Sequence, residues 1–264
     1  MSRPLLQFSH ANGFPAPCYR AFLAHLAGRF DIRHVDRFGH DPRHPVAEGW
    51  HALTDELIGA VESHGQPAVL LGHSLGGYLS FRVALQRPDL VRGVVLLDAP
   101  LLSRFKGGAL ALTKRLGLVD RFTPAPGTQR RRREWVSPEA AAEHFRAKPV
   151  FRRFAPEALD DYVRHGTVTE GGSTRLAFDP DVEYRIYRTL PHGLAREGHA
   201  LSMPAGLVVG EESEISRRVP PPGETGPRLP WRSGPARWSR PETRPRTTSS
   251  PRPGRRRAVS RQRR

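Results

Sequence analysis

The sequence predicts an α/β fold with a mostly parallel sheet, and three observations lead to this prediction. Residues 1–98 alternate short apolar runs with longer amphipathic segments, as βα units do. The segment Leu75–Arg87 is apolar on most of its faces, which is typical of a helix packed against the middle of a sheet. From residue 101 to residue 203 the apolar period changes and strand signals become rare. We therefore expect a parallel sheet whose strands are separated along the chain by one long helical insertion.

Each early element has its own signal. Trp50, Leu53, Leu57, Ile58 and Val61 recur at helical spacing, so the sequence predicts a helix there. The other early elements that we expect are strands at Leu5–Ser9, Phe30–Asp36, Ala68–Gly72 and Val91–Leu97 and a helix at Tyr19–Gly28.

Helix starts are the clearest signals inside the insertion. Ser137-Pro138-Glu139 combines a capping serine, a proline at the first helical position and an early carboxylate. Asp179-Pro180 opens another helix, and Pro156 and Gly166 bracket a third. A strand resumes at Ala205–Val209. The chain therefore divides into the first part of a core (1–100), a helical insertion (101–203), a core strand with the loop after it (204–215) and a tail (216–264).

The tail differs from the rest of the chain in composition. It holds 15 Arg, 2 Glu and ten Pro, and it supplies most of the formal net charge of +16. Because it can bury little apolar surface, we expect it to be disordered. One hypothesis is that its arginines bind nucleic-acid phosphates without sequence specificity, although no binding fold surrounds them. The abrupt change in composition also suggests that this segment is translated in a shifted reading frame.

The single cysteine and the absence of long apolar runs indicate in which compartment of the cell we expect the protein. Cys18 excludes an internal disulfide and suits a reducing compartment. The N-terminal apolar run is too short for a signal peptide, and no run approaches the ~18 apolar residues of a membrane span. We expect a cytoplasmic protein that spans no membrane and uses neither a metal nor another cofactor.

Gly72-His73-Ser74-Leu75-Gly76 lies between the predicted strand Ala68–Gly72 and the helix that follows it. In G-x-S-x-G the serine occupies a strained strand-to-helix turn, and bulky residues two positions away would clash with neighbouring backbone. The start of the helix adds a positive dipole beside a developing oxyanion. The pattern predicts that Ser74 is a nucleophile.

His10-Ala11-Asn12-Gly13-Phe14-Pro15 directly follows the first predicted strand. A glycine at this point lets a backbone N–H turn toward a substrate carbonyl. We expect the N–H groups of Phe14 and Leu75 to form an oxyanion hole, with Asn12 and Gly13 shaping the loop.

Together these two motifs resemble the α/β-hydrolase family, in particular its members with an N-G-F-P loop and a helical cap. The resemblance covers residues 1 to about 215 and implies a cap formed by 101–203 and a triad in the order serine, acid, histidine. A serine at position 74 separates the chain from relatives with an aspartate nucleophile. The resemblance implies that the acid follows the strand after the cap, where Glu214 is the best match and Glu212 a weaker one. Asp98, at the end of the preceding strand, is the alternative acid.

The catalytic histidine of this family lies beyond the acid, but no histidine follows His199 in this sequence. His10, His73, His192 and His199 are the substitutes to consider. We expect His73 to point away from the active face, and the others to be surface residues or hydrogen-bond partners.

Four consecutive arginines lie within the insertion, at 130–133. They could hold an anionic group of a substrate, but a solvated loop is the more common role of such a run.

Two main functions follow from these expectations. The first is a serine hydrolase of ester-type bonds, esterase-like and acting through an acyl-enzyme, impaired because the region of the catalytic histidine is missing. The second is a catalytically inactive hydrolase scaffold that binds a small hydrophobic ligand. The expected partner is a small acyl or ester substrate, and the oligomeric state is left open.

Overall fold

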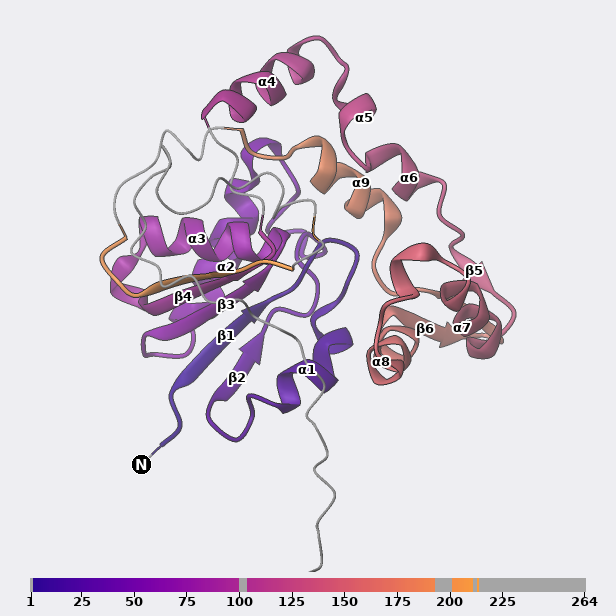
Figure 1. Cartoon of the computed structure of the whole chain (residues 1–264), viewed down its shortest axis with the longest axis horizontal. Helices are drawn as coiled ribbons and strands as arrows, with labels where there is room; N and C mark the ends of the chain where they lie inside the picture. The colour runs from indigo at the N-terminus through magenta and orange to yellow at the C-terminus, as the bar shows by residue number, and fades with distance from the viewer. Residues whose placement is uncertain (1, 100–103, 193–200, 211–212, 214–264) are drawn as a thin grey trace, which may run out of the picture. The chain divides into compact units, whose positions relative to one another are not determined.

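In a computed structural model, which describes residues 2–99, 104–192, 201–210 and 213, the predicted parallel sheet is present. Its five strands are arranged in the order β2-β1-β3-β4-β8, and every neighbouring pair is parallel (Figure 1). The strands are β1 (Leu5–Ser9), β2 (Asp31–His34), β3 (Ala68–His73), β4 (Val91–Leu97) and β8 (Ala205–Val208).

Alternating side chains of these strands form cores on the two faces of the sheet. Leu5, Leu70 and Leu96 belong to the larger core. They pack there with residues of α2 (His51–Glu62) and α3 (Leu75–Gln86). Leu6 and Leu71 point to the opposite face, where Leu23 of α1 (Arg20–Ala24) covers them. The central strands β1, β3 and β4 are thus mostly buried on both faces, as strands of parallel sheets are.

Two early predictions were too long. The α-helix predicted at Tyr19–Gly28 covers only Arg20–Ala24 and follows a 3-10 turn at Ala16–Tyr19. Strand β2 occupies only the central part of Phe30–Asp36. The other 3-10 turns are Glu48–Trp50, Pro88–Leu90 and Pro149–Phe151.

The segment between β4 and β8, called the insertion below, contains six helices in its described part. They are α4 (Arg104–Arg115), α5 (Val119–Phe122), α6 (Ala125–Gln129), α7 (Pro138–Arg146), α8 (Pro156–Gly166) and α9 (Pro180–Arg188). The predicted helix starts are confirmed. The Ser137 hydroxyl accepts from the N–H of Ala140, and the Asp179 carboxylate accepts from the N–H of Asp181.

The insertion also contains a small antiparallel sheet, which the prediction of a helical insertion did not include. Its order is β5-β7-β6, with β5 at Glu134–Trp135, β6 at Thr167–Glu170 and β7 at Ser173–Leu176. Gly171 and Gly172 join β6 to β7 with φ angles of 58° and 83°. A Gly-Gly pair between β-branched residues is a hairpin signal, and here it is the feature that could have revealed the sheet.

The insertion has an aromatic core of its own that reaches the segment after β1. Trp135, Phe145, Phe151 and Tyr162 are buried in it, and Cys18 lies among them. Burial raises the pKa of the Cys18 thiol to about 12, which argues against a nucleophilic role for this cysteine.

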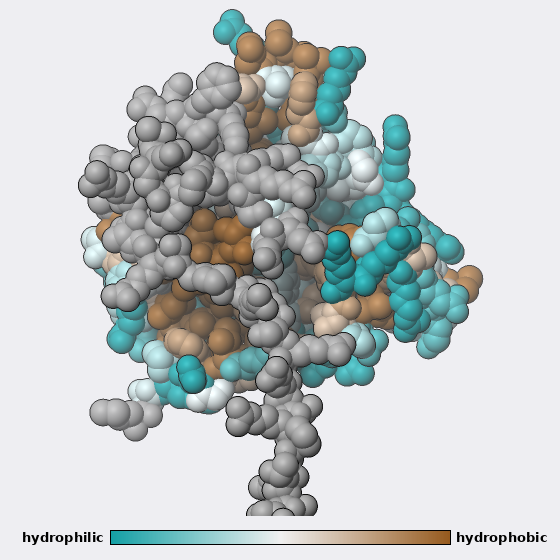
Figure 2. Space-filling view, viewed as in Figure 1, coloured by the Kyte–Doolittle hydropathy of each residue, from teal (hydrophilic) through white to brown (hydrophobic). Residues whose placement is uncertain are grey.

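Polar and apolar side chains are distributed unevenly over the insertion. Figure 2 shows hydrophilic residues over the region of α7 and β5 and a hydrophobic group over α4. Leu112 of α4 and Leu116, which follows that helix, are 56% and 60% exposed. Across the described ranges, no helix combines the length and apolar character needed to cross a bilayer.

We predict that Gly76→Ala destabilises the fold by about 3 kcal/mol in urea unfolding, because an added Cβ would lie 2.1 Å from the Ser9 carbonyl oxygen. Gly59→Ala is the matched control. Gly59 lies inside α2 with no atom within 4 Å of an added Cβ, so this change should stabilise the protein by roughly 0.5–1 kcal/mol. Equal effects of the two substitutions would contradict the steric argument.

Candidate functional site

Ser74 lies in the turn between β3 and α3, in a conformation that non-glycine residues rarely adopt. Its φ and ψ are 50° and −110°. The Ser74 N–H donates to the Leu97 carbonyl at 3.0 Å, and the Ser74 carbonyl accepts from the N–H of Tyr78. These bonds hold the strained residue between the ends of two parallel strands and the first turn of α3. Strain of this kind occurs at functional sites when the surrounding structure enforces it.

The two glycines of the motif allow this turn. A Cβ at Gly72 would lie 2.2 Å from the Gly76 carbonyl oxygen. The Gly76 N–H donates to the His10 carbonyl at 3.0 Å, which ties the start of α3 to the end of β1. Contacts this close leave no space for a side chain at either glycine.

A small cavity opens beside Ser74. Its volume is about 80 Å³, and mostly apolar side chains surround it. The lining residues are Asn12, Trp50, Ser74, Leu75, Tyr78, Ile186, Tyr187 and Leu190. Residues that precede the insertion in the chain and residues of the insertion itself therefore line the same cavity.

Phe14 does not take the place that the sequence predicts for it. Its N–H donates to the Ala11 carbonyl at 3.1 Å and is therefore engaged in a turn. The Phe14 ring packs against the rings of Phe151, Phe154 and Tyr162 in the insertion. Asn12, from the same loop, lines the cavity instead, next to Ser74 and Leu75.

Residues of the insertion bind this loop. The Asn12 amide donates to the Glu183 carbonyl at 3.0 Å, and the Tyr162 hydroxyl donates to the Gly13 carbonyl at 3.3 Å. Gly13 has a φ of 78°, and a Cβ there would lie 2.7 Å from a Glu183 carboxylate oxygen. Burial raises the pKa of Tyr162 to about 12, so the phenol keeps the proton that it donates.

A buried ion pair completes this contact. Arg131 donates to the Glu183 carboxylate at 2.5 Å and to the Tyr162 oxygen at 2.8 Å. The expectation of a solvated arginine run at 130–133 was therefore wrong at this position. Of its neighbours, Arg133 pairs with Asp181 near the surface, and Arg132 lies over the Trp135 ring.

Asp98 is the predicted acid that falls within the described residues. It follows β4 with a φ of 46°, and its N–H donates to the Val208 carbonyl at 2.7 Å. The Ser213 hydroxyl donates to Asp98 Oδ2 at 2.8 Å, while Oδ1 is buried with no hydrogen-bond partner in the described ranges. Glu212 and Glu214 lie outside those ranges.

His10 is fully buried, and both ring nitrogens are engaged. Nε2 accepts from the Phe38 N–H at 2.9 Å, so Nδ1 carries the proton and contacts the Ala11 carbonyl at 2.8 Å. Burial lowers the pKa of His10 to about 4. His10 is thus a neutral residue that holds the loop together, and it has no nitrogen free to act as a base.

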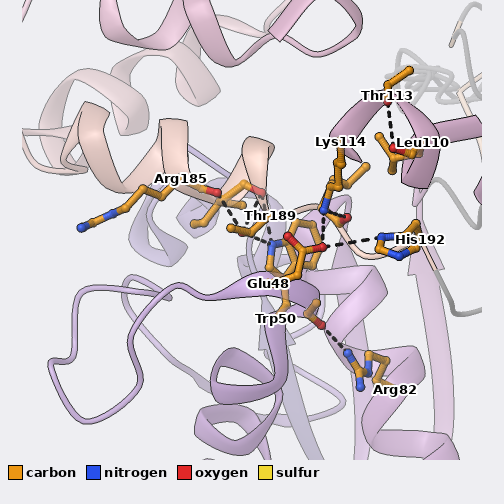
Figure 3. A network of polar contacts seen from close by, with 12 residues as sticks. Glu48, Trp50, Arg82, Leu110, Thr113, Lys114, Arg185, Thr189 and His192 are labelled. Carbon is orange, nitrogen blue, oxygen red and sulfur yellow. Dashed lines mark hydrogen bonds and ion pairs between the residues drawn. The ribbon is translucent and has the colours of Figure 1, made fainter. Parts of the chain in front are cut away.

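His73 and His192 also lie away from the cavity wall. His73 Nδ1 is 2.8 Å from the Tyr19 hydroxyl, and burial lowers the pKa of His73, although the Asp98 carboxylate opposes this shift. His192 is 3.6 Å from the Glu48 carboxylate, which also accepts from Lys114 at 2.5 Å (Figure 3). His199 lies outside the described residues. Of the residues that the structure describes, those lining the cavity include no histidine.

Within the same residues, no group of three or more His, Cys, Asp or Glu side chains could hold a metal ion.

The parallel sheet with its helices is the fold of an α/β hydrolase. The sequence profile of the alpha/beta hydrolase family matches residues 8–238, and the chain belongs to this family. Its relatives include hydrolases and lipases. The chain is 33% identical over 100 residues to the 2-(acetamidomethylene)succinate hydrolase of Mesorhizobium japonicum, covering 37% of this chain and 36% of that protein. It is 38% identical over 79 residues to the lipase LipV of Mycobacterium tuberculosis, covering 29% and 30%. The matched segments thus span about a third of these relatives.

Solved structures share the fold over a larger part of the chain. E-2-(acetamidomethylene)succinate hydrolase superposes with a TM-score of 0.61 at 23% identity, over 81% of this chain and 75% of that one. The peroxisomal alpha-beta-hydrolase Lpx1 of Saccharomyces cerevisiae gives 0.59 at 16% identity, over 81% and 64%.

We predict that Arg131→Met costs roughly 3–5 kcal/mol of unfolding free energy, because it leaves the Glu183 carboxylate buried without its partner. Arg133→Met is the matched control and should cost less than about 1 kcal/mol, since the Arg133–Asp181 pair is about half exposed. Adding Glu183→Gln to Arg131→Met should recover part of the loss. Equal losses for both arginine variants would contradict this prediction.

We also predict a pH dependence of stability that comes from His10. The unfolded chain takes up a proton near pH 6.5, whereas the buried ring does so only near pH 4, so this contribution to stability is present above pH 6.5 and is lost as the pH falls toward 4. The unfolding free energy of the unmodified chain, minus that of His10→Gln, should fall by about 2 kcal/mol between pH 7 and pH 4.5. Parallel curves for the two proteins would show that His10 titrates normally.

Proposed function

We propose that this chain is a serine hydrolase of ester-type bonds in which Ser74 is the nucleophile. The observation that carries the proposal is the strained Ser74 turn beside a small apolar cavity. Such a turn presents the serine hydroxyl at the end of the sheet, where a substrate carbonyl can approach it.

The backbone N–H groups of Leu75 and Asn12 are the proposed oxyanion donors. Leu75 begins α3, and the first N–H groups of a helix have no acceptor within that helix. Asn12 replaces Phe14 in this role, because the Phe14 N–H is engaged and Asn12 lines the cavity. Each donor contributes about 3 kcal/mol to stabilising the transition state.

The insertion is the proposed cap. Ile186 and Leu190 come from it and line the same cavity as Ser74, so a substrate would contact both the cap and the turn after β3. Asp98 is the proposed acid, supported by its buried Oδ1, which can accept a hydrogen bond from an imidazole. Glu214, the acid that the family resemblance favours, remains the other candidate.

In the proposed reaction, Ser74 Oγ attacks the carbonyl carbon of the ester and loses its proton, which the base of an intact triad would accept and which solvent water accepts when that base is missing. The tetrahedral intermediate expels the alcohol, which takes a proton, and water then releases the acid from the acyl-serine. Because no histidine lines the cavity in the described part of the chain, we propose that this base is absent and the activity impaired. Oxyanion donors and binding alone leave roughly 10³-fold catalysis over water.

A fluorophosphonate probe tests this proposal. Serine Oγ displaces fluoride at phosphorus, so slow labelling of the unmodified chain, lost in Ser74→Ala and kept in the surface control Ser63→Ala, is the expected result. Mass spectrometry of the peptide that holds Ser74 locates the label. Free imidazole should accelerate labelling if the base is missing.

Two other results are informative. Fast ester turnover without added imidazole would contradict the impairment. Absence of labelling at any pH, with or without imidazole, would contradict the role of Ser74. It would favour the second candidate, a scaffold that binds a small apolar ligand in the same cavity.

A further inference from the structure

Within the described ranges, three residues other than glycine have a positive φ: Trp50 at 57°, Ser74 at 50° and Asp98 at 46°. Two of them are the proposed nucleophile and the proposed acid. The third, Trp50, has no assigned role, but it lines the same cavity as Ser74. A large aromatic residue in the left-handed region is uncommon and persists only where its surroundings enforce it.

Hydrogen bonds engage the backbone N–H and the carbonyl of both Trp50 and Gly49. The Trp50 N–H donates to the Ala47 carbonyl at 3.2 Å, and the Trp50 carbonyl accepts from the Thr54 hydroxyl at 2.9 Å. The preceding Gly49 donates to the Thr189 carbonyl at 3.2 Å and accepts from the Arg82 guanidinium (Figure 3). The unusual conformation is thus fixed from α2, from α3 and from the end of α9.

The indole ring is fixed as well. Trp50 is only 3% exposed, and its Nε1 donates to the Ile186 carbonyl at 3.1 Å and to the Thr189 hydroxyl at 3.2 Å. Its ring meets the Tyr78 ring edge-on, with centroids 5.4 Å apart. The ring therefore forms a rigid wall of the cavity, with its polar atom turned toward α9.

The cavity that this wall bounds is small. An apolar cavity of about 150 Å³ accommodates benzene, so the volume of about 80 Å³ beside Ser74 accommodates roughly three or four carbon atoms. We propose that Trp50 sets the specificity of the site by limiting the acyl group to short apolar chains of about four carbons. This inference rests on the proposed function, because it takes the cavity to be the acyl site of Ser74.

Substitution at Trp50 tests the limit. Trp50→Leu removes part of the wall, and Trp50→Gly removes all of it at a position whose φ suits glycine. Binding of 1-alkanols with three to ten carbons is measured by saturation-transfer NMR on a Ser74→Ala background, which cannot react. With Trp50 present, affinity should stop rising near four carbons. In Trp50→Leu it should continue to rise, about fourfold per added methylene, and in Trp50→Gly over still longer chains.

Trp135→Leu is the matched control. Trp135 is equally buried but belongs to the aromatic core of the insertion and does not line the cavity. The substitution Trp135→Leu should destabilise the protein without changing how alkanol affinity depends on chain length. If folded Trp50→Leu keeps the original profile, the proposal is wrong. If neither Trp50 variant folds, Leu190→Phe replaces them in the test, because it adds bulk to the cavity wall. This variant should shorten the longest alkanol that the cavity binds. An unchanged dependence of affinity on chain length would then overturn the proposal.

Labelling by n-alkyl fluorophosphonates of the Trp50 variants that keep Ser74 separates this inference from the proposed function. A shifted alkanol profile without any labelling would refute the nucleophile but leave the role of Trp50 intact. Labelling of Ser74 with a profile that is the same in all Trp50 variants would support the hydrolase and refute the limit.

Discussion

The close backbone contact between the end of β1 and the start of α3 is the constraint on which the site depends. Gly76 lies so near Ser9 that a single methyl group would separate the strand from the helix. The same contact brings the His10 carbonyl to the Gly76 N–H and sets the turn that contains Ser74. Sheet pairing, helix start and nucleophile geometry are therefore not independent features, because a shift of one moves the others.

A second layer of control comes from the insertion. Glu183 and Tyr162 bind the loop after β1 directly, and Arg131 holds both side chains in place. The loop that carries Asn12 is consequently fixed by residues far away in the sequence. A site of this kind is preorganised by packing and buried polar bonds, and it does not need substrate to order it.

The parallel sheet and the Ser74 turn could be predicted because both have local patterns: an apolar period in the strands and helices, and small residues at fixed spacing around the serine. Features that depend on contacts between residues far apart in the sequence could not be predicted in this way. Arg131 lies in a run that looks solvated, and its partner Glu183 lies 52 residues further along the chain. The Phe14 N–H is engaged in a turn and Asn12 lines the cavity, and residue type alone does not encode this difference. Trp50 has the spacing of a helical residue, yet it takes a left-handed conformation before α2 begins.

The strands that flank the insertion are direct neighbours in the sheet, with Val94 opposite Ala205 and Leu97 opposite Val208. The chain thus leaves the sheet and returns to it at adjacent positions of one edge. Because the entropy of closing a loop grows only slowly with its length, a segment of different size and sequence could join the same two strands at little thermodynamic cost. The arrangement makes the insertion an exchangeable module, so that grafting another hydrolase's segment between β4 and β8 could change the chemistry of the cavity while the sheet keeps its topology.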